Sequence, residues 1–157
     1  MAEEFFSRNG RTNVNAPYLT ARLAAEVRRR CAESLAELNL GQFQHAILCC
    51  LDEFGPQFQK EVAARLGIDS GDMVGFVDDL QDAALVERQR DPRDRRRQIL
   101  TVTSRGKRIL VKAEKLLDAA TAEAYSPLTP AERSTLHKLM LRVLAQNEPE
   151  AWPADEA

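Results

Sequence analysis

Basic residues gather in one short stretch of the chain, between residues 88 and 108. Nine of them stand there with two aspartates, so the stretch carries a net charge of +7, against −2 for all 157 residues. They are Arg88, Arg90, Arg93, Arg95, Arg96, Arg97, Arg105, Lys107 and Arg108. Guanidinium groups are planar cations with several donors, which suits them to phosphates and to a narrow DNA minor groove. Such a run is either a solvated face or a polyanion-binding surface.

The local pattern places much of this charge on a β-hairpin. Residues 85–90 (LVERQR) predict a short strand, and 98–103 (QILTVT) predict a returning strand rich in β-branched residues. Between them, residues 91–94 (DPRD) predict a turn with proline in its second position. We therefore expect an arginine-rich hairpin, called the wing below.

Two short helices are expected before the wing, joined by a tight turn that contains Gly67. The first covers residues 57–66, and the second runs from about Ser70 to Ala84, with Asp69 or Ser70 as its cap. The apolar face of the second helix is formed by Met73, Val77, Leu80 and Ala84. Its opposite face is small and acidic, with Gly71, Asp72, Gly75, Asp78, Asp79 and Asp82. These carboxylates would repel phosphates unless Arg88 or the wing arginines pair with them.

Four more helices follow from apolar residues that recur every three or four positions, over residues 18–38, 43–54, 104–125 and 130–146. Thr103 is expected to cap the third of these, and Thr129 and Glu132 form a capping box at the fourth. The predicted fold class is mainly α: a winged helix-turn-helix with about six helices and a β-hairpin wing.

The order of these elements offers a way to read duplex DNA. A helix fits the major groove, and a basic hairpin beside it can reach the backbone and the neighbouring minor groove. We expect one unit over residues 17–146, with a DNA-binding part at 41–103 and dimerisation helices at 17–40 and 104–146. The ends are expected to be a flexible arm over 1–16 and an acidic tail over 147–157.

One long segment resembles the recognition helix and wing of the MarR (multiple antibiotic resistance regulator) family: LGIDSGDMVGFVDDLQDAALVERQRDPRDRRRQILTVTSRG. Its most specific signature is an Asp-x-Arg pattern, Asp94 and Arg96, followed seven residues later by Thr103. Val102 stands where the family usually has leucine. The order of elements resembles this bacterial family over about residues 17–146.

The resemblance implies that Arg96 at the wing tip enters the minor groove while Arg93, Arg95 and Arg97 contact phosphates. Asp94 would orient the wing arginines. The positions that read bases in the family correspond here to Ser70, Gly71, Asp72, Met73 and Gly75.

The helix that should read bases departs from the common pattern, because it presents no cationic side chain to the groove. Asp72 either accepts a hydrogen bond from cytosine or forms a capping box with Asp69. Lys60 and Gln57, near the start of the preceding helix, are either phosphate contacts or plain surface residues.

The partners implied are duplex DNA with a near-palindromic operator, a second copy of the chain, and a small aromatic or phenolic effector whose contact residues we cannot name. We expect a homodimeric repressor that the effector releases. The alternative is a winged-helix module for protein partners with weak or no DNA binding. The sequence shows no phosphate loop, nucleophile elbow or metal-protease motif, so an enzyme is not expected.

The cysteines and histidines predict no cofactor. Cys31, Cys49 and Cys50 lie within expected helices and are interpreted as reduced core thiols. His45 and His137 have no ligand at zinc-like spacing, so no metal site is expected. The chain has no stretch of roughly 20 apolar residues and no signal-peptide pattern, which predicts a cytoplasmic protein without membrane contact.

Overall fold

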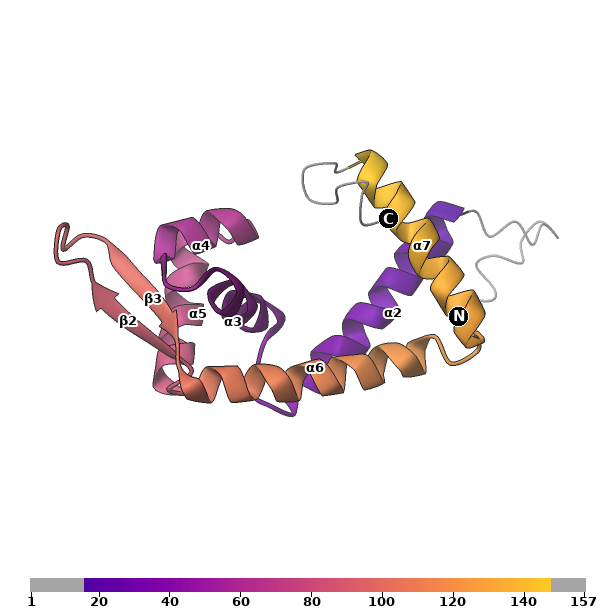
Figure 1. Cartoon of the computed structure of the whole chain (residues 1–157), viewed down its shortest axis with the longest axis horizontal. Helices are drawn as coiled ribbons and strands as arrows, with labels where there is room; N and C mark the ends of the chain where they lie inside the picture. Colours follow the sequence, from indigo (N-terminus) through magenta and orange to yellow (C-terminus); the bar gives the residue numbers. More distant parts are fainter. Residues whose placement is uncertain (1–15, 148–157) are drawn as a thin grey trace. The chain divides into compact units, whose positions relative to one another are not determined.

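The computed structural model describes residues 16–147, with side chains from residue 18 onward (Figure 1). It has two compact units, the first ending at Ala120 and the second beginning at Thr121. The expected arm and tail lie outside the described residues, apart from residues 16 and 147 themselves. The elements are α2 (Ala16–Ala36), α3 (Gln42–Phe54), β1 (Gln57–Phe58), α4 (Gln59–Leu66), α5 (Ser70–Asp82), β2 (Val86–Arg90), β3 (Gln98–Val102), α6 (Ser104–Ala124) and α7 (Pro130–Asn147).

The first unit contains a small antiparallel sheet with the strand order β1-β3-β2. Strands β2 and β3 form the predicted wing, and the mainly α class with a β-hairpin is confirmed. The expectation of a helix throughout residues 57–66 is wrong at its start, because Gln57 and Phe58 form strand β1. Their backbone groups pair with the free edge of β3, and helix α4 begins only at Gln59.

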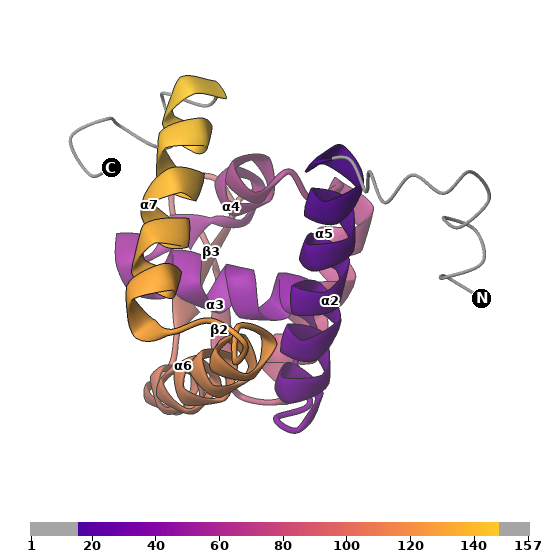
Figure 2. The ribbon, with the colours of Figure 1, turned by 90° about the vertical axis from the view of Figure 1, so that its right-hand side faces the viewer.

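The core of the first unit surrounds helix α3 (Figure 2). Ile47, Leu48 and Leu51 on this helix are fully buried, and α3 contacts α4, α5 and β3. Those neighbours contribute the buried side chains Val62, Met73, Val77, Leu80 and Leu100. Burying a large apolar side chain contributes roughly 1.5–3 kcal/mol. The helix-turn-helix and the wing are therefore built on one shared core.

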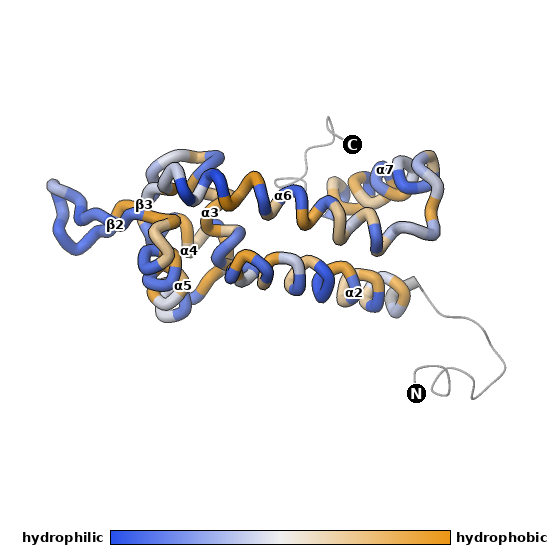
Figure 3. Tube along the Cα trace, turned by 90° about the horizontal axis from the view of Figure 1, so that it is seen from below, coloured by the Kyte–Doolittle hydropathy of each residue, from blue (hydrophilic) through white to orange (hydrophobic). Residues whose placement is uncertain are grey.

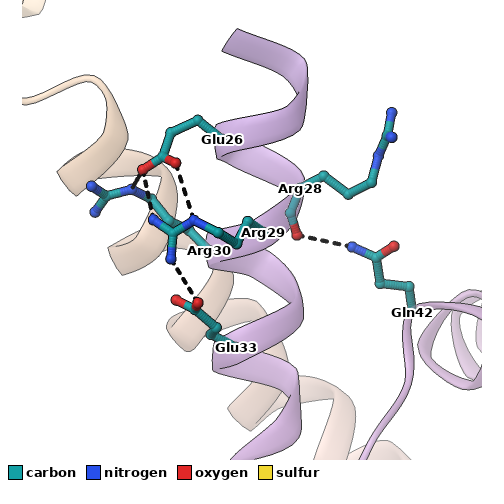
Figure 4. A network of polar contacts seen from close by, with 6 residues as sticks. All are labelled: Glu26, Arg28, Arg29, Arg30, Glu33 and Gln42. Carbon is teal, nitrogen blue, oxygen red and sulfur yellow. Dashed lines mark hydrogen bonds and ion pairs between the residues drawn. The ribbon is translucent and has the colours of Figure 1, made fainter. Parts of the chain in front are cut away.

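Helix α2 carries a network of charged side chains (Figure 4). The Glu26 carboxylate accepts hydrogen bonds from Arg29 (2.8 Å) and Arg30 (2.6 Å), which lower its pKa to about 2. Beside this network, the Arg28 carbonyl accepts a hydrogen bond from the Gln42 side chain (3.1 Å). The hydrogen bond between Gln42 and Arg28 connects the first turn of α3 to α2.

Thr103, between β3 and α6, makes the predicted helix cap and two further contacts. Its hydroxyl accepts a hydrogen bond from the Gly106 N–H (2.9 Å) and donates one to the Ala84 carbonyl (2.8 Å). Its own N–H donates to the Leu85 carbonyl (3.0 Å). Ala84 is not on the buried face of α5 as expected: α5 ends at Asp82, and Ala84 is exposed with a φ of 57°. This left-handed residue terminates the helical path before β2 begins.

The second unit consists of the end of α6 and helix α7. The predicted capping box is present, because the Thr129 N–H donates to the Glu132 carboxylate (2.8 Å) and the Thr129 hydroxyl accepts from the Glu132 N–H (3.3 Å). Helix α7 has no buried residue, and Leu139, Met140 and Val143 are exposed apolar side chains on it. Across residues 16–147, the structure offers no helix that is both long and apolar enough to cross a membrane.

Replacing Gly106 with alanine is expected to destabilise the first unit. The added Cβ would clash with the Leu85 carbonyl oxygen and lie 2.8 Å from Val102 Cγ2. Because backbone atoms are among those that must move, we expect the free energy of unfolding in urea to fall by about 2–3 kcal/mol. The exposed neighbour gives the control, Arg105→Ala, which should change it by less than about 0.5 kcal/mol. Equal urea midpoints for the two variants would contradict this packing.

Candidate nucleic-acid interface

Helices α4 and α5 meet across a tight turn at Gly67. This residue has a φ of 63°, in the left-handed region that favours glycine, and the following Ile68 N–H donates to the Ala63 carbonyl (2.9 Å). Asp69 is the cap of α5, since its carboxylate accepts a hydrogen bond from the Gly71 N–H (2.7 Å). The predicted helix-turn-helix is present, and the first turn of α5 is held by its own cap.

The start of α5 exposes four of the five predicted base-reading residues: Ser70, Gly71, Asp72 and Gly75. The fifth, Met73, is 1% exposed and belongs to the core, so its placement at a base-reading position is wrong. The alternative role of Asp72 in a capping box is not observed, because no hydrogen bond joins the Asp72 carboxylate to the Asp69 N–H in the described part of the chain. Val74, which the sequence analysis missed, is 45% exposed.

Two of the acidic residues on α5 are paired within the chain. Asp78 Oδ1 lies 2.7 Å from Nη2 of Arg88 on β2, the partner predicted from the sequence. The Asp79 carboxylate accepts a hydrogen bond from the Gln44 amide on α3 (2.9 Å). The ion pair offsets part of the repulsion that these carboxylates would exert on a nearby phosphate.

The tip of the wing is a turn built around Asp94. The Arg97 N–H donates to the Asp94 carbonyl (2.9 Å), so the hydrogen-bonded turn spans residues 94–97 and not the expected 91–94. The Asp94 carboxylate accepts hydrogen bonds from both the backbone N–H (3.0 Å) and the Nε (3.2 Å) of Arg96. An Asp side chain favours such a turn when it bonds to the backbone N–H two residues later in the chain. The position of the proline had indicated a turn three residues earlier.

Three of the four predicted wing arginines are available to a ligand. The Arg96 side chain is 92% exposed, and Arg93 and Arg95 are exposed too. Figure 3 shows that the projecting end of the hairpin is hydrophilic. Their contact with nucleic acid stays a prediction, but nothing among the described residues covers them.

Arg97 is engaged within the chain instead. Its guanidinium carbon lies 3.4 Å from the centre of the Phe58 ring in β1, and its Nη2 lies 3.5 Å from Oε1 of Glu61 on α4. A cation over an aromatic face is attracted by the ring's quadrupole. The end of the wing-tip turn is thereby joined to β1 and α4 through contacts that residue spacing does not predict.

The two further candidates near α4 have different surroundings. Lys60 is exposed, whereas Gln57 is half-buried in β1, where its amide donates to the Phe54 carbonyl (3.4 Å). Lys60 is the better placed of the two to meet a phosphate. Phosphate contacts by Lys60 and Gln57 stay predictions.

The thiols and histidines show no activated pair. Cys49 Sγ lies 3.5 Å from Nε2 of His45, but burial raises the pKa of the Cys49 thiol and lowers the pKa of His45. Cys50 is buried, and burial raises the pKa of its thiol as well. A reactive thiolate needs the opposite shift. Within residues 16–147, no three potential metal ligands stand together.

Comparison with known proteins finds similarity to one family of regulators. The sequence model of the MarR family matches residues 40–97, from the start of α3 to the wing tip. The crystal structure of wild-type MarR (apo form) from E. coli aligns with a TM-score of 0.75 and 25% identity, over 83% of this chain and 97% of that one. Residues 40–97 are thus similar to the MarR family, and the fold of the chain matches that of MarR structures. By this similarity, α5 corresponds to the recognition helix of the family and β2–β3 to its wing.

Curated relatives bear the names of transcriptional regulators and not of enzymes. The uncharacterized regulator YkoM of Bacillus subtilis is 30% identical over 97 residues, which make up 62% of this chain and 63% of YkoM. The chain thus spans less than two thirds of that relative. The transcriptional repressor NicR of Pseudomonas putida is 27% identical over 69% of each chain. A mutant of E. coli MarR complexed with operator DNA aligns with a TM-score of 0.67 at 25% identity, over 83% of this chain and 94% of that one.

The distinct role of Arg97 in this MarR wing can be measured through stability. Replacing Arg97 with alanine removes the contacts to Phe58 and Glu61, so we expect the free energy of unfolding to fall by about 1 kcal/mol in urea denaturation. Arg95→Ala is the matched control, because Arg95 is exposed and should change stability little. If both variants unfolded at the same urea concentration, the contacts of Arg97 would make no measurable contribution to the free energy of unfolding.

Proposed function

We propose that the chain is a homodimeric MarR-type transcriptional regulator that binds double-stranded DNA. The observation that carries this proposal is the wing tip, where Arg96 is 92% exposed and is held by the Asp94 carboxylate. The tip lies in the stretch of net charge +7. An exposed, oriented guanidinium on a projecting hairpin fits the narrow minor groove, whose negative potential attracts it.

The two reading elements contribute unequally in this proposal. Helix α5 would enter the major groove with an exposed face that has no lysine or arginine from residue 70 to residue 82. Phosphate neutralisation would then rest on the wing, through Arg96 in the minor groove and through Arg93 and Arg95 at the backbone. Affinity that depends on phosphate contacts falls steeply as salt rises, because binding releases counterions.

The dimer is proposed from the apolar side chains that helices α2 and α7 leave exposed. Leu19 is 53% and Leu23 is 37% exposed on α2, and Val143 is 63% exposed on α7. Exposed apolar stripes on terminal helices fit burial against the same helices of a second copy. Two recognition helices related by a two-fold axis would contact half-sites about one helical turn apart on a near-palindromic operator.

Repression and release by an effector belong to the same proposal, and they are supported by the similarity to the MarR family. The name of NicR, a transcriptional repressor, is consistent with repression. The effector class that the resemblance implies is a small aromatic or phenolic molecule.

A second candidate, a winged-helix module for a protein partner, is favoured by one observation. The exposed face of α5 combines the unpaired carboxylate of Asp72 with the apolar side chain of Val74, a surface that could suit a protein as well as DNA. This alternative predicts little or no salt-dependent affinity for DNA.

The wing can be tested by DNA binding across a salt series. We expect the wild type to bind its own upstream DNA more tightly than unrelated duplex, with affinity that drops as salt rises. Arg96→Ala should weaken binding roughly 5- to 150-fold, by about 1–3 kcal/mol, and should flatten the plot of log K against log salt by about one unit.

Two control variants separate charge from geometry in that experiment. Arg28→Ala removes an arginine on α2, far from the wing in sequence, and should leave affinity and salt slope unchanged. Arg96→Lys keeps the charge but loses the planar donor set, so it should recover the salt slope more than the affinity. Salt-independent wild-type binding without preference for any duplex would favour the protein-partner alternative.

The dimer can be tested by sedimentation equilibrium. A charge at the most exposed apolar side chain of α7 should oppose association, so we expect Val143→Glu to raise the dissociation constant of the dimer at least tenfold. Ser134→Glu introduces the same charge on the opposite side of α7 and is expected to remain dimeric. Equal dissociation constants for the two variants would place the interface elsewhere.

A further inference from the structure

Gly75 is an unexplained glycine in the middle of the recognition helix. Glycine disfavours a helix relative to alanine, so a glycine at an exposed helical position needs a reason. Gly75 has no positive φ, and a Cβ added to it would meet no atom of the described residues within 4 Å. Residues 16–147 therefore give no cause for this glycine, which leaves the close approach of a ligand as its explanation.

Gly71, one helical turn earlier, provides a useful contrast. A Cβ at Gly71 would lie 3.1 Å from Oδ1 of Asp69, the carboxylate that caps α5. This glycine has an internal explanation in the cap. It nevertheless adds to a strip of bare backbone along the exposed face of α5, since Gly71 and Gly75 are four residues apart.

Val74 stands beside this strip, and it is the one apolar side chain there. Residues 71, 74, 75 and 78 share one helix face by their spacing, and Val74 is 45% exposed on it. Asp78 at the far end of this face is paired with Arg88 (2.7 Å). The face therefore offers bare backbone and the two methyl groups of one valine, with no cation or amide between residues 70 and 78.

We propose that Val74 reads thymine through the C5-methyl group in the major groove, and that Gly75 lets the helix backbone come close enough for this contact. The proposal rests on the proposed function, namely that α5 enters the major groove of duplex DNA. Apolar side chains discriminate thymine by packing against its methyl group, whereas the other base edges are read by donors and acceptors. Residues 71, 74 and 75 carry no side-chain donor or acceptor, and Asp78 on the same face is paired with Arg88. Specificity at this position is then for thymine, by shape and hydrophobicity.

The test begins with an operator obtained by in vitro selection with the wild-type protein. Each thymine of a half-site is then replaced by deoxyuridine, which removes the methyl group and keeps the base pair. At one or two positions we expect the wild type to bind about fourfold more weakly, the loss that corresponds to one buried methyl group. Val74→Ala should bind the thymine operator more weakly and no longer distinguish thymine from uracil at those positions.

A matched control is Val111→Ala, which removes an exposed valine from α6, outside the recognition helix and wing (52% exposed). It should retain both the affinity and the sensitivity to uracil. The inference is overturned if no thymine methyl matters to the wild type, or if Val74→Ala keeps the full sensitivity.

Gly75→Ala tests the close approach separately. We expect this variant to unfold at a higher urea concentration than the wild type while binding the operator at least tenfold more weakly. Higher stability with unchanged affinity would overturn the role given to Gly75. If the selection enriches no sequence at all, the proposed function fails together with this inference, whereas an enriched operator without methyl dependence overturns the inference alone.

Discussion

The hydrogen bonds of Thr103 fix the relation between the recognition helix, the wing and α6. One hydroxyl caps α6 through the Gly106 N–H and also reaches the Ala84 carbonyl, at the point where the chain leaves α5 for β2. Gly106 must lack a side chain for the two segments to meet there. The orientation of the wing relative to α5 depends on this junction, and every proposed DNA contact depends on that orientation.

The features that could be predicted from the sequence are those with local causes. Asp69, Thr103 and the Thr129 capping box act on backbone groups within three residues, so residue type and spacing were enough to place them. The ion pair of Asp78 with Arg88 was also within reach, because adjacent elements carried opposite charge. The helix faces followed from their period, and with them most of the core.

The features that could not be predicted depend on parts of the chain that meet only after folding. Phe58 has an apolar side chain that fits a helix as well as a strand, and only the free edge of β3 decides for the strand. The engagement of Arg97 follows from that pairing, which brings the Phe58 ring beneath the guanidinium. The exposure of Val74 has no local signal in the sequence, because a valine in a helix fits the core as well as the surface. Sequence patterns thus identified the wing and the recognition helix. They did not indicate which of their side chains are exposed and which are engaged within the chain.

The segregation of charge along the chain bears on the speed of encounter with DNA. The stretch from residue 88 to residue 108 carries +7, so the remaining residues together carry −9. Under the proposed function, the field of a polyanion would attract the basic wing and repel the acidic residues before any contact forms. Encounters with the wing foremost would be favoured over encounters with acidic residues foremost. Diffusional search would then bring the wing to the duplex first.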